Sequence, residues 1–180
     1  MEQALVALII IAIMISGALT LVVSAISPMD DIATSWKQMS TRTNEMQRTD
    51  IAIIDAVVPE EQSGALVELT IRNEGKVSLC DYGSWDMIVQ YYSDNTTRSI
   101  AWLPYTTSLE DNKWTVPSYP NGIYYNGSPE TYEPNILNPG EDMKVQIQLD
   151  PPIGLNTTNW ATISASNGVS TRTIFQRESS

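Results

Sequence analysis

The sequence contains no histidine and only one cysteine, Cys80, among its 180 residues. Without histidine, the chain lacks the side chain that most often serves as a general base near neutral pH. A single cysteine excludes an intrachain disulfide. Because no histidine is present to activate its thiol, we interpret Cys80 as a buried small apolar residue and not as a nucleophile. These absences favour a structural protein over a catalytic one.

Basic residues are also scarce. The sequence contains ten Lys and Arg residues and 21 Asp and Glu residues, which gives a net charge of −11. This negative charge argues against nucleic acid as a partner, because the phosphates would be repelled. Residues 1–58 hold six acidic and three basic residues (−3), and residues 59–180 hold fifteen acidic and seven basic residues (−8). The second part therefore has the composition of an acidic, solvated body, and the first part is a different kind of segment.

Motifs that bind phosphate, zinc or an acyl substrate are missing as well. The sequence has no Gly-rich phosphate loop, no zinc-ligand spacing and no serine elbow. The acidic clusters at 30–31, 60–61 and 110–112 lack the spacing of a cation-binding loop, so we interpret them as solvated surface charge. We predict no catalytic residues, no cofactor and no metal, and hence no enzyme.

The N-terminal segment is long and apolar. Residues 3–29 are 27 consecutive uncharged positions, mostly Leu, Ile, Val, Ala and Met. As a helix they would span about 40 Å, which exceeds the bilayer core of about 30 Å. A secretory signal peptide would begin with a basic region and have a shorter apolar stretch, whereas here the first basic residue is Lys37. We expect a membrane-inserted or otherwise buried helix from which a basic leader has already been removed.

The apolar pattern continues beyond Asp30 in steps of three and four, which is typical of a coiled-coil seam. A helix reaching residue 48 would be about 70 Å long, whereas a domain of ~120 residues is only about 30 Å across. We therefore expect helices of different copies to pack together, and the alternative is a stripe packed on the chain's own domain. The seam comprises Val22, Ala25, Met29, Ile32, Trp36, Met39, Thr43 and Met46.

From about residue 51 the apolar period changes from 3.6 to 2, which predicts strands. The segments "ALVELTIRN" and "MKVQIQL" alternate apolar and polar residues, and "DMIVQYY", "SIAWL", "WATISAS" and "STRTIFQ" are further strand candidates. Turn signals such as "NEG", "NPGE" and "SNG" separate them. The whole chain is therefore predicted to be α+β, with a long N-terminal hydrophobic α-helix (1–50) followed by an antiparallel β-sandwich (51–180).

A stretch rich in Tyr, Trp, Pro and Asn interrupts the strand pattern, and we expect a structured insertion at about 94–136. One interpretation is a loop packed on the sheet by its own aromatic residues. The other is an exposed surface for neighbouring subunits or sugars.

Three Asn-x-Ser/Thr sequons begin at Asn95, Asn126 and Asn156, all near turns. We predict N-glycosylation at these sites, and the alternative is that they are ordinary polar turn residues.

Four segments follow the apolar helix in a fixed order: "RTDIAIIDAVV", "ELTIRNEGKVSL", "ILNPGEDMKVQIQL" and "ASNGVSTRTIF". Together they resemble the archaellin superfamily, which comprises archaeal flagellins related to type IV pilins and also the stator-type accessory subunits of the archaellum. The resemblance covers about residues 3–58, 65–93 and 137–176, and the aromatic-rich stretch has no counterpart in it.

The resemblance implies a course of events for the helix. A leader peptidase removes a short basic leader, the helix waits in the cytoplasmic membrane, and an assembly platform transfers it into a filament core. The immunoglobulin-like β-sandwich then faces outward, extracellular and glycosylated at Asn95, Asn126 and Asn156. The implied helix-core residues are Leu5, Leu8, Ile9, Ile11, Ala12, Ile15, Leu19, Val22, Ile26, Ile32, Trp36, Met39 and Met46.

We accordingly expect a structural subunit of a helical surface filament for motility or adhesion, present in many identical copies. Two alternatives remain open. One is a membrane-anchored accessory subunit of the same machinery that binds the cell envelope. The other is a carbohydrate-binding surface module, suggested by the aromatic-rich stretch.

Overall fold

The structure is a computed structural model that describes residues 2–93, 97–118, 120–133 and 135–178. Within the helix, the side chains of residue 2 and of residues 21–28 lie outside this description. The chain divides into two compact units, Met1–Asn44 and Glu45–Ser180.

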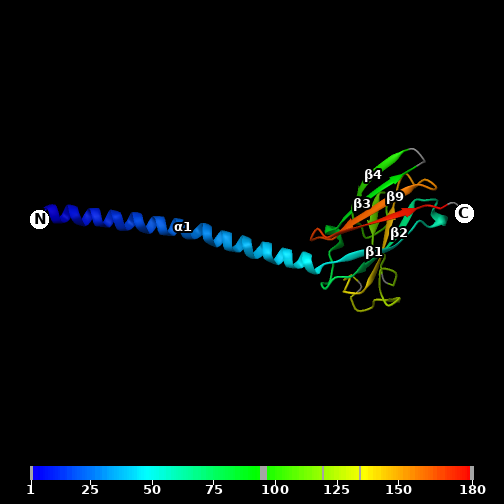
Figure 1. Ribbon diagram of the computed structural model, residues 1–180, viewed down its shortest axis with the longest axis horizontal. Coiled ribbons are helices and arrows are strands. Elements are labelled where there is room, and N and C mark those ends of the chain that lie inside the picture. Colours follow the sequence, from blue (N-terminus) through cyan, green and yellow to red (C-terminus); the bar gives the residue numbers. More distant parts are fainter. Residues whose placement is uncertain (1, 94–96, 119, 134, 179–180) are drawn as a thin grey trace. The chain divides into compact units, whose positions relative to one another are not determined.

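The first unit is helical. Helix α1 runs without interruption from Glu2 to Arg48 over 47 residues, about 70 Å by its rise (Figure 1). Ile, Leu, Ala and Val dominate its first half, and the helix continues through Pro28. The positive charge of Arg48 in the last turn interacts favourably with the negative end of the helix dipole. The predicted long N-terminal helix is confirmed.

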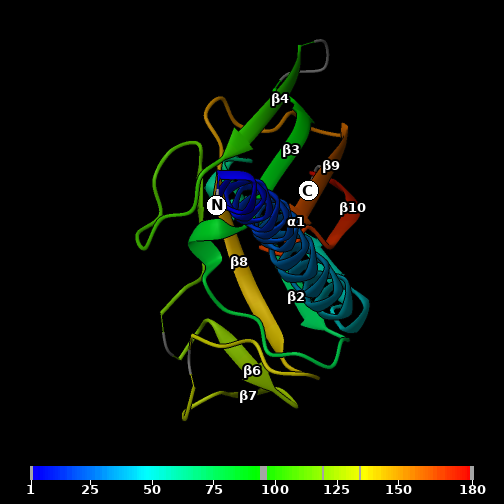
Figure 2. The ribbon, with the colours of Figure 1, turned by 90° about the vertical axis from the view of Figure 1, so that its left-hand side faces the viewer.

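The second unit contains two antiparallel sheets. In the first sheet, β2 (Leu66–Asn73) lies between β1 (Ile51–Val57) and β8 (Asp142–Gln148). The far edge of β8 carries two short strands, β5 (Lys113–Thr115) and β6 (Ile123–Tyr125), and β6 pairs with β7 (Ser128–Pro129). Figure 2 shows β6 and β7 at the end of this layer.

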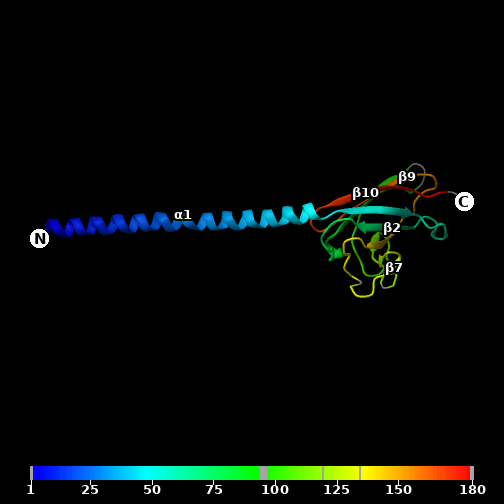
Figure 3. The same ribbon diagram turned by 60° about the horizontal axis from the view of Figure 1, so that its bottom comes forward.

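The second sheet has the strand order β10-β9-β3-β4. Its members are β3 (Asp86–Tyr92), β4 (Arg98–Leu103), β9 (Thr158–Ser164) and β10 (Ser170–Gln176). Two 3-10 turns, η1 (Glu60–Gln62) and η2 (Tyr82–Ser84), lie in the connections. Figure 3 shows β9 and β10 in one layer and β2 in the other. The predicted α+β class, an N-terminal helix followed by an antiparallel β-sandwich, is confirmed.

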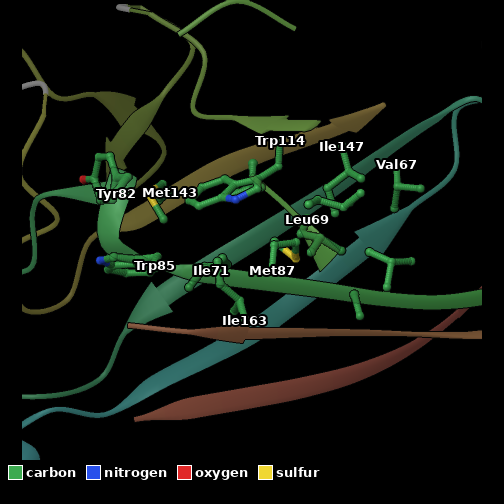
Figure 4. Packing of buried hydrophobic residues seen from close by; sticks show 14 of the residues in the cluster. Val67, Leu69, Ile71, Tyr82, Trp85, Met87, Trp114, Met143, Ile147 and Ile163 are labelled. Atoms are coloured by element: carbon green, nitrogen blue, oxygen red, sulfur yellow. The ribbon is translucent and has the colours of Figure 1, made fainter. Parts of the chain in front are cut away.

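The core lies between the two sheets and follows the predicted alternation. Leu69 of β2 and Val145 of β8 are opposite each other and fully buried, whereas Glu68 and Thr70 on the other face are only partly buried. Met87 and Ile163 approach from the second sheet (Figure 4). Because each strand has period 2, one face of every central strand enters the core.

The aromatic-rich stretch is built into both sheets. It supplies edge strand β4 of the second sheet and the short strands β5, β6 and β7 of the first. The indole of Trp114 in β5 is fully buried and packs 5.0 Å from the ring of Tyr105, centroid to centroid. Other aromatic residues of the stretch are exposed, including Trp102 and Tyr132.

The last turn of α1 belongs to the second unit and is hydrogen-bonded to it. Asn167 Nδ2 donates to Thr49 Oγ1 at 2.7 Å, and the Lys76 amide donates to the Arg48 carbonyl at 2.7 Å. A Cβ on Gly75 would lie 2.6 Å from the Asp50 amide nitrogen, so only glycine permits this close approach. The residues just before β1 are therefore held in place by two segments that are distant in sequence, residues 75–76 and Asn167.

Because the core is drawn from residues after position 50, we expect residues 27–180 to fold without the first 26 residues. The truncated chain should be a soluble monomer that unfolds cooperatively, with a free energy of unfolding of roughly 5–15 kcal/mol. Circular dichroism with denaturant and sedimentation analysis measure both properties. The full chain in detergent is the control. An unfolded or aggregated fragment would contradict the two-unit organisation.

Candidate assembly interface

The first part of α1 has the composition of a buried helix. Its segment Gln3–Thr20 has a mean hydropathy of 2.3, carries no charged residue and is 0% buried. By length and composition it can cross a membrane. Each large aliphatic side chain that leaves water gains about 1.5–3 kcal/mol, so the segment gains free energy by entering lipid or a bundle of helices.

The predicted helix-core residues are exposed wherever their side chains are described. Leu8 and Trp36 are each 70% exposed, and the others follow the same pattern. The exposed set comprises Leu5, Leu8, Ile9, Ile11, Ala12, Ile15, Leu19, Ile32, Trp36, Met39 and Met46. The side chains of Val22 and Ile26 lie outside the described residues. Their packing in an assembly remains a prediction.

Sequence reasoning missed further apolar side chains of the same helix. Val6, Ile10, Ile13 and Met14 are also exposed, by 51–70% in the case of the last three. They lie on other sides of the helix, because none of them is three or four residues away from Leu5 or Leu8. A helix that is apolar all round is typical of burial by several neighbours or by lipid. The absence of charge over residues 3–20 could have indicated that these side chains are also part of the buried surface.

The hydroxyl side chains of this segment are bonded within the helix itself. Ser16 Oγ donates to the Ile13 carbonyl at 3.0 Å, and Thr20 Oγ1 donates to the Ser16 carbonyl at 2.7 Å. Hydroxyls satisfied by the preceding turn do not require water. The segment can therefore be buried without leaving these donors unpaired.

The second part of α1 has a different character. Charged residues begin at Asp30 and Asp31, and the apolar residues narrow to a stripe that includes Ile32, Trp36 and Met39. Steps of three and four suit packing along a seam with few partners. The helix thus combines an end that is apolar on all sides with an amphipathic continuation.

Two of the three sequons lie in exposed turns that favour asparagine. Asn126 and Gly127 have φ of 50° and 79° and connect the paired residues Tyr125 and Ser128. This is the two-residue hairpin in which Asn-Gly is preferred. Asn156 has φ of 57°, and its backbone N–H donates to the Arg177 carbonyl at 2.8 Å. Asn95 lies outside the described residues, and glycosylation at all three sites remains a prediction.

Because Asn126 has a conformational reason to be asparagine, the sequons are best tested at their hydroxyl residues. We expect Ser128→Ala and Thr158→Ala each to lower the intact mass by one glycan, and Ser128→Thr and Thr158→Ser to retain it. Intact-protein mass spectrometry measures the difference. An unchanged mass in the alanine variants would make these asparagines turn residues alone.

A few polar groups are buried in the sandwich. The Tyr82 hydroxyl and Trp114 Nε1 are buried with no hydrogen-bond partner in the described part of the chain. Burial raises the pKa of the Tyr82 phenol. Burial also raises the pKa of Glu141, although its carboxylate accepts a hydrogen bond from the backbone N–H of Asn138 at 2.7 Å, which acts in the opposite direction. Across the described ranges, no cluster of three or more His, Cys, Asp or Glu side chains is arranged to hold a metal ion.

The interpretation of Cys80 as a buried residue is wrong. Its side chain is exposed. The residue lies in the connection before η2, where its carbonyl accepts Trp85 Nε1 at 3.2 Å. Cys80 thus contributes its backbone carbonyl as the hydrogen-bond acceptor of the buried Trp85 indole, and its side chain is exposed at the surface.

Comparison of the sequence with protein-family models gives no match. A search of curated proteins gives none either. Among solved structures, the archaeal flagellum of Methanospirillum hungatei strain JF1 is similar with a TM-score of 0.55 and 17% identity, over 96% of this chain and 91% of that chain. This likeness shows a shared fold, an N-terminal helix followed by a β-sandwich.

Two further structures come from Sulfolobus acidocaldarius. The archaellum periplasmic stator protein complex FlaF and FlaG has a TM-score of 0.49 and 20% identity, over 69% of this chain and 87% of that chain. The archaellum periplasmic stator protein FlaG has a TM-score of 0.46 and 20% identity, over 71% and 99%.

Proposed function

We propose that this chain is a structural, non-catalytic subunit of an archaellum-like helical surface filament. One observation carries the proposal. A helix that is apolar on all sides over Gln3–Thr20 precedes an acidic β-sandwich, in a chain that shares its fold over 96% of its length with a chain of an archaeal flagellum. Such a helix needs a covering that a single chain does not provide.

The helix serves two states in turn. Before assembly, Gln3–Thr20 lies in the cytoplasmic membrane, where lipid covers its side chains. In the filament, helices of other copies replace the lipid. Both environments are apolar, so the transfer exposes little hydrocarbon to water and depends on close packing between helices.

The sandwich faces outward in this proposal. Its charge of −8 over residues 59–180 keeps the surface hydrated and soluble. A subunit that contacts the next one through two different surfaces produces an open helical array, whereas a two-fold contact would close. Head-to-tail contact between copies therefore gives a filament of unlimited length.

The proposed partners follow from this course of assembly. They are many copies of the same chain, the membrane before assembly, a leader peptidase and an assembly platform. N-linked glycans at Asn95, Asn126 and Asn156 would cover the outer surface.

Electron microscopy of filaments sheared from cells, with mass spectrometry of the same fraction, tests the proposal. We expect thin filaments in which this chain is the dominant protein and begins without a basic leader. Filaments made of another protein, with this chain left in the membrane fraction, would overturn the proposal and favour an envelope-binding accessory subunit.

A further inference from the structure

The two outer faces of the sandwich differ in chemistry. On the outer face of the first sheet, Arg72 Nε lies 2.7 Å from Asp142 Oδ1, and Gln146 Nε2 donates to Glu68 Oε1 at 2.8 Å. These polar side chains bond across neighbouring strands β2 and β8. This face has the composition expected of a sheet surface in contact with water.

The outer face of the second sheet carries five large apolar side chains, which come from all four strands. The register places Ile174, Trp160 and Ile100 in one row, with Gln90 between Trp160 and Ile100. Ile88 and Trp102 are neighbours in the next row, which continues through Thr162 to Arg172. The isoleucines at 88, 100 and 174 are 42%, 67% and 61% exposed, and Trp102 is 60% exposed. We call these five residues the apolar outer face; its four strands can be followed in Figure 2. A contiguous apolar patch of this kind marks an interaction site more often than a monomer surface.

Strand β4 adds a free sheet edge to this surface. The Ser93 backbone N–H donates to the Thr97 carbonyl, so Thr97 directs its backbone N–H and C=O toward β3. In an antiparallel pair every second residue does the same, so the residues two, four and six positions after Thr97 also direct their N–H and C=O groups toward β3. Ile100 and Trp102 therefore direct theirs away from the sheet, and β4 has no second neighbour in the described sheet order. The strand contains no Pro or Lys, and Arg98 at its start is its one charged residue, so little protects this edge.

The charges around this face are the reverse of those on the rest of the body. Arg98 and Arg172 lie on it, and the Arg172 guanidinium sits 5.5 Å from the centre of the Trp160 ring. Its one carboxylate, Asp86, accepts Trp102 Nε1 at 2.9 Å. Residues 59–180 hold fifteen acidic and seven basic residues. Without Arg98, Arg172 and Asp86, fourteen acidic and five basic residues remain, so the rest of the body has a net charge of −9. A second copy therefore offers this face an acidic surface of opposite charge.

The size of the face also favours a second copy in an assembly. Four strands of about seven residues cover about 15 by 20 Å, or roughly 300 Å². A stable free complex buries about 800 Å² on each partner. The face alone is too small for that, but it suffices where helices already hold the copies together.

We infer that the apolar outer face and the β4 edge contact the acidic body surface of a second copy of this chain. The inference rests on the proposed function and deepens it. Since the two surfaces in contact are different, the contact is head-to-tail and repeats along an open array.

A photo-crosslinker placed in the full-length chain in its own cells tests the inference. Benzoylphenylalanine replaces Trp102 in one variant and Lys144, on the polar outer face of the first sheet, in the matched control. We expect a product of twice the chain mass in the sheared fraction, at least tenfold more abundant from position 102. Peptide mapping should place the second attachment on an acidic segment. Crosslinks from 102 to another protein or to a glycan alone, or equal yields from both positions, overturn the inference.

Charge reversal provides a second measurement. In the chain carrying the crosslinker at 102, Arg98→Glu with Arg172→Glu should lower the chain-to-chain product at least fivefold, and Lys144→Glu should not. An unchanged yield overturns the role of charge in the contact. If no filaments form, the same crosslink is measured in the membrane fraction. A chain-to-chain product there retains the contact while the filament proposal fails, so the two failures are distinguishable.

Discussion

Leu8→Asp is expected to abolish filaments while the β-sandwich remains folded. Leu8 lies within the uncharged segment Gln3–Thr20, and its side chain is 70% exposed and available to neighbours. An aspartate near the middle of a buried helix costs about 3–4 kcal/mol relative to leucine. At 1.4 kcal/mol for each factor of ten, the population of chains whose helix is buried, in the membrane or in the filament, falls roughly 100- to 1000-fold relative to chains whose helix is in water. The carboxylates of neighbouring copies would also repel one another.

Counting filaments in sheared fractions by electron microscopy measures this effect. Leu8→Ala is the first control, since it removes contacts without adding a charge and should leave filaments present. Ser40→Asp is the second, because it adds the same charge to the part of α1 that already carries charged residues. Normal filaments from Leu8→Asp would exclude a core built from these helices.

Trp114→Ala is expected to destabilise the sandwich by about 3–5 kcal/mol, the usual cost of removing a buried Trp or Phe. The indole is fully buried and packs on Tyr105, so alanine leaves a cavity that strands β5 and β8 cannot close. For a body of this size the melting temperature should fall by about 10–20 °C. Denaturant unfolding of residues 27–180 measures the free energy directly.

Two matched variants test whether the loss of stability comes from the burial of Trp114. Trp102→Ala removes the same side chain from an exposed position and should cost about 1 kcal/mol or less, because it loses little packing. Trp114→Phe should cost less than half as much as alanine, since it fills most of the space and removes a buried N–H that has no partner among the described residues. Equal losses from Trp102→Ala and Trp114→Ala would contradict the assignment of Trp114 to the core.

The helix and the central strands were predictable because each shows a local period. Residues 3–29 contain no charge to set a polar face, and "ALVELTIRN" and "MKVQIQL" alternate over enough positions to identify their buried side. The structure confirms this for Leu69 and Val145, which are opposite each other in adjacent strands. Local period does not say which strands become neighbours, because β2 and β8 are far apart in the sequence and are brought together only by the tertiary structure.

The aromatic-rich stretch shows where local reasoning ends. Trp102 and Trp114 lie twelve positions apart in similar surroundings of Tyr, Pro and Thr, yet one is 60% exposed and the other fully buried. Their difference follows from the sheet that each strand joins: β4 forms an edge of the second sheet, and β5 pairs with β8. The exposed position of Cys80 escaped prediction for a similar reason, since it depends on the carbonyl that Trp85 needs.

By itself, the sequence determined the helix, its lack of charge over Gln3–Thr20 and the apolar faces of the longest strands, because these depend on side chains near one another along the chain. Only the tertiary structure decided which Trp is core and which is surface, and that Ile88, Ile100, Trp102, Trp160 and Ile174 form one outer face. These residues come from four strands over a range of 87 positions, from 88 to 174. Strand pairing brings them together, and pairing depends on the burial of the whole core and not on any one segment.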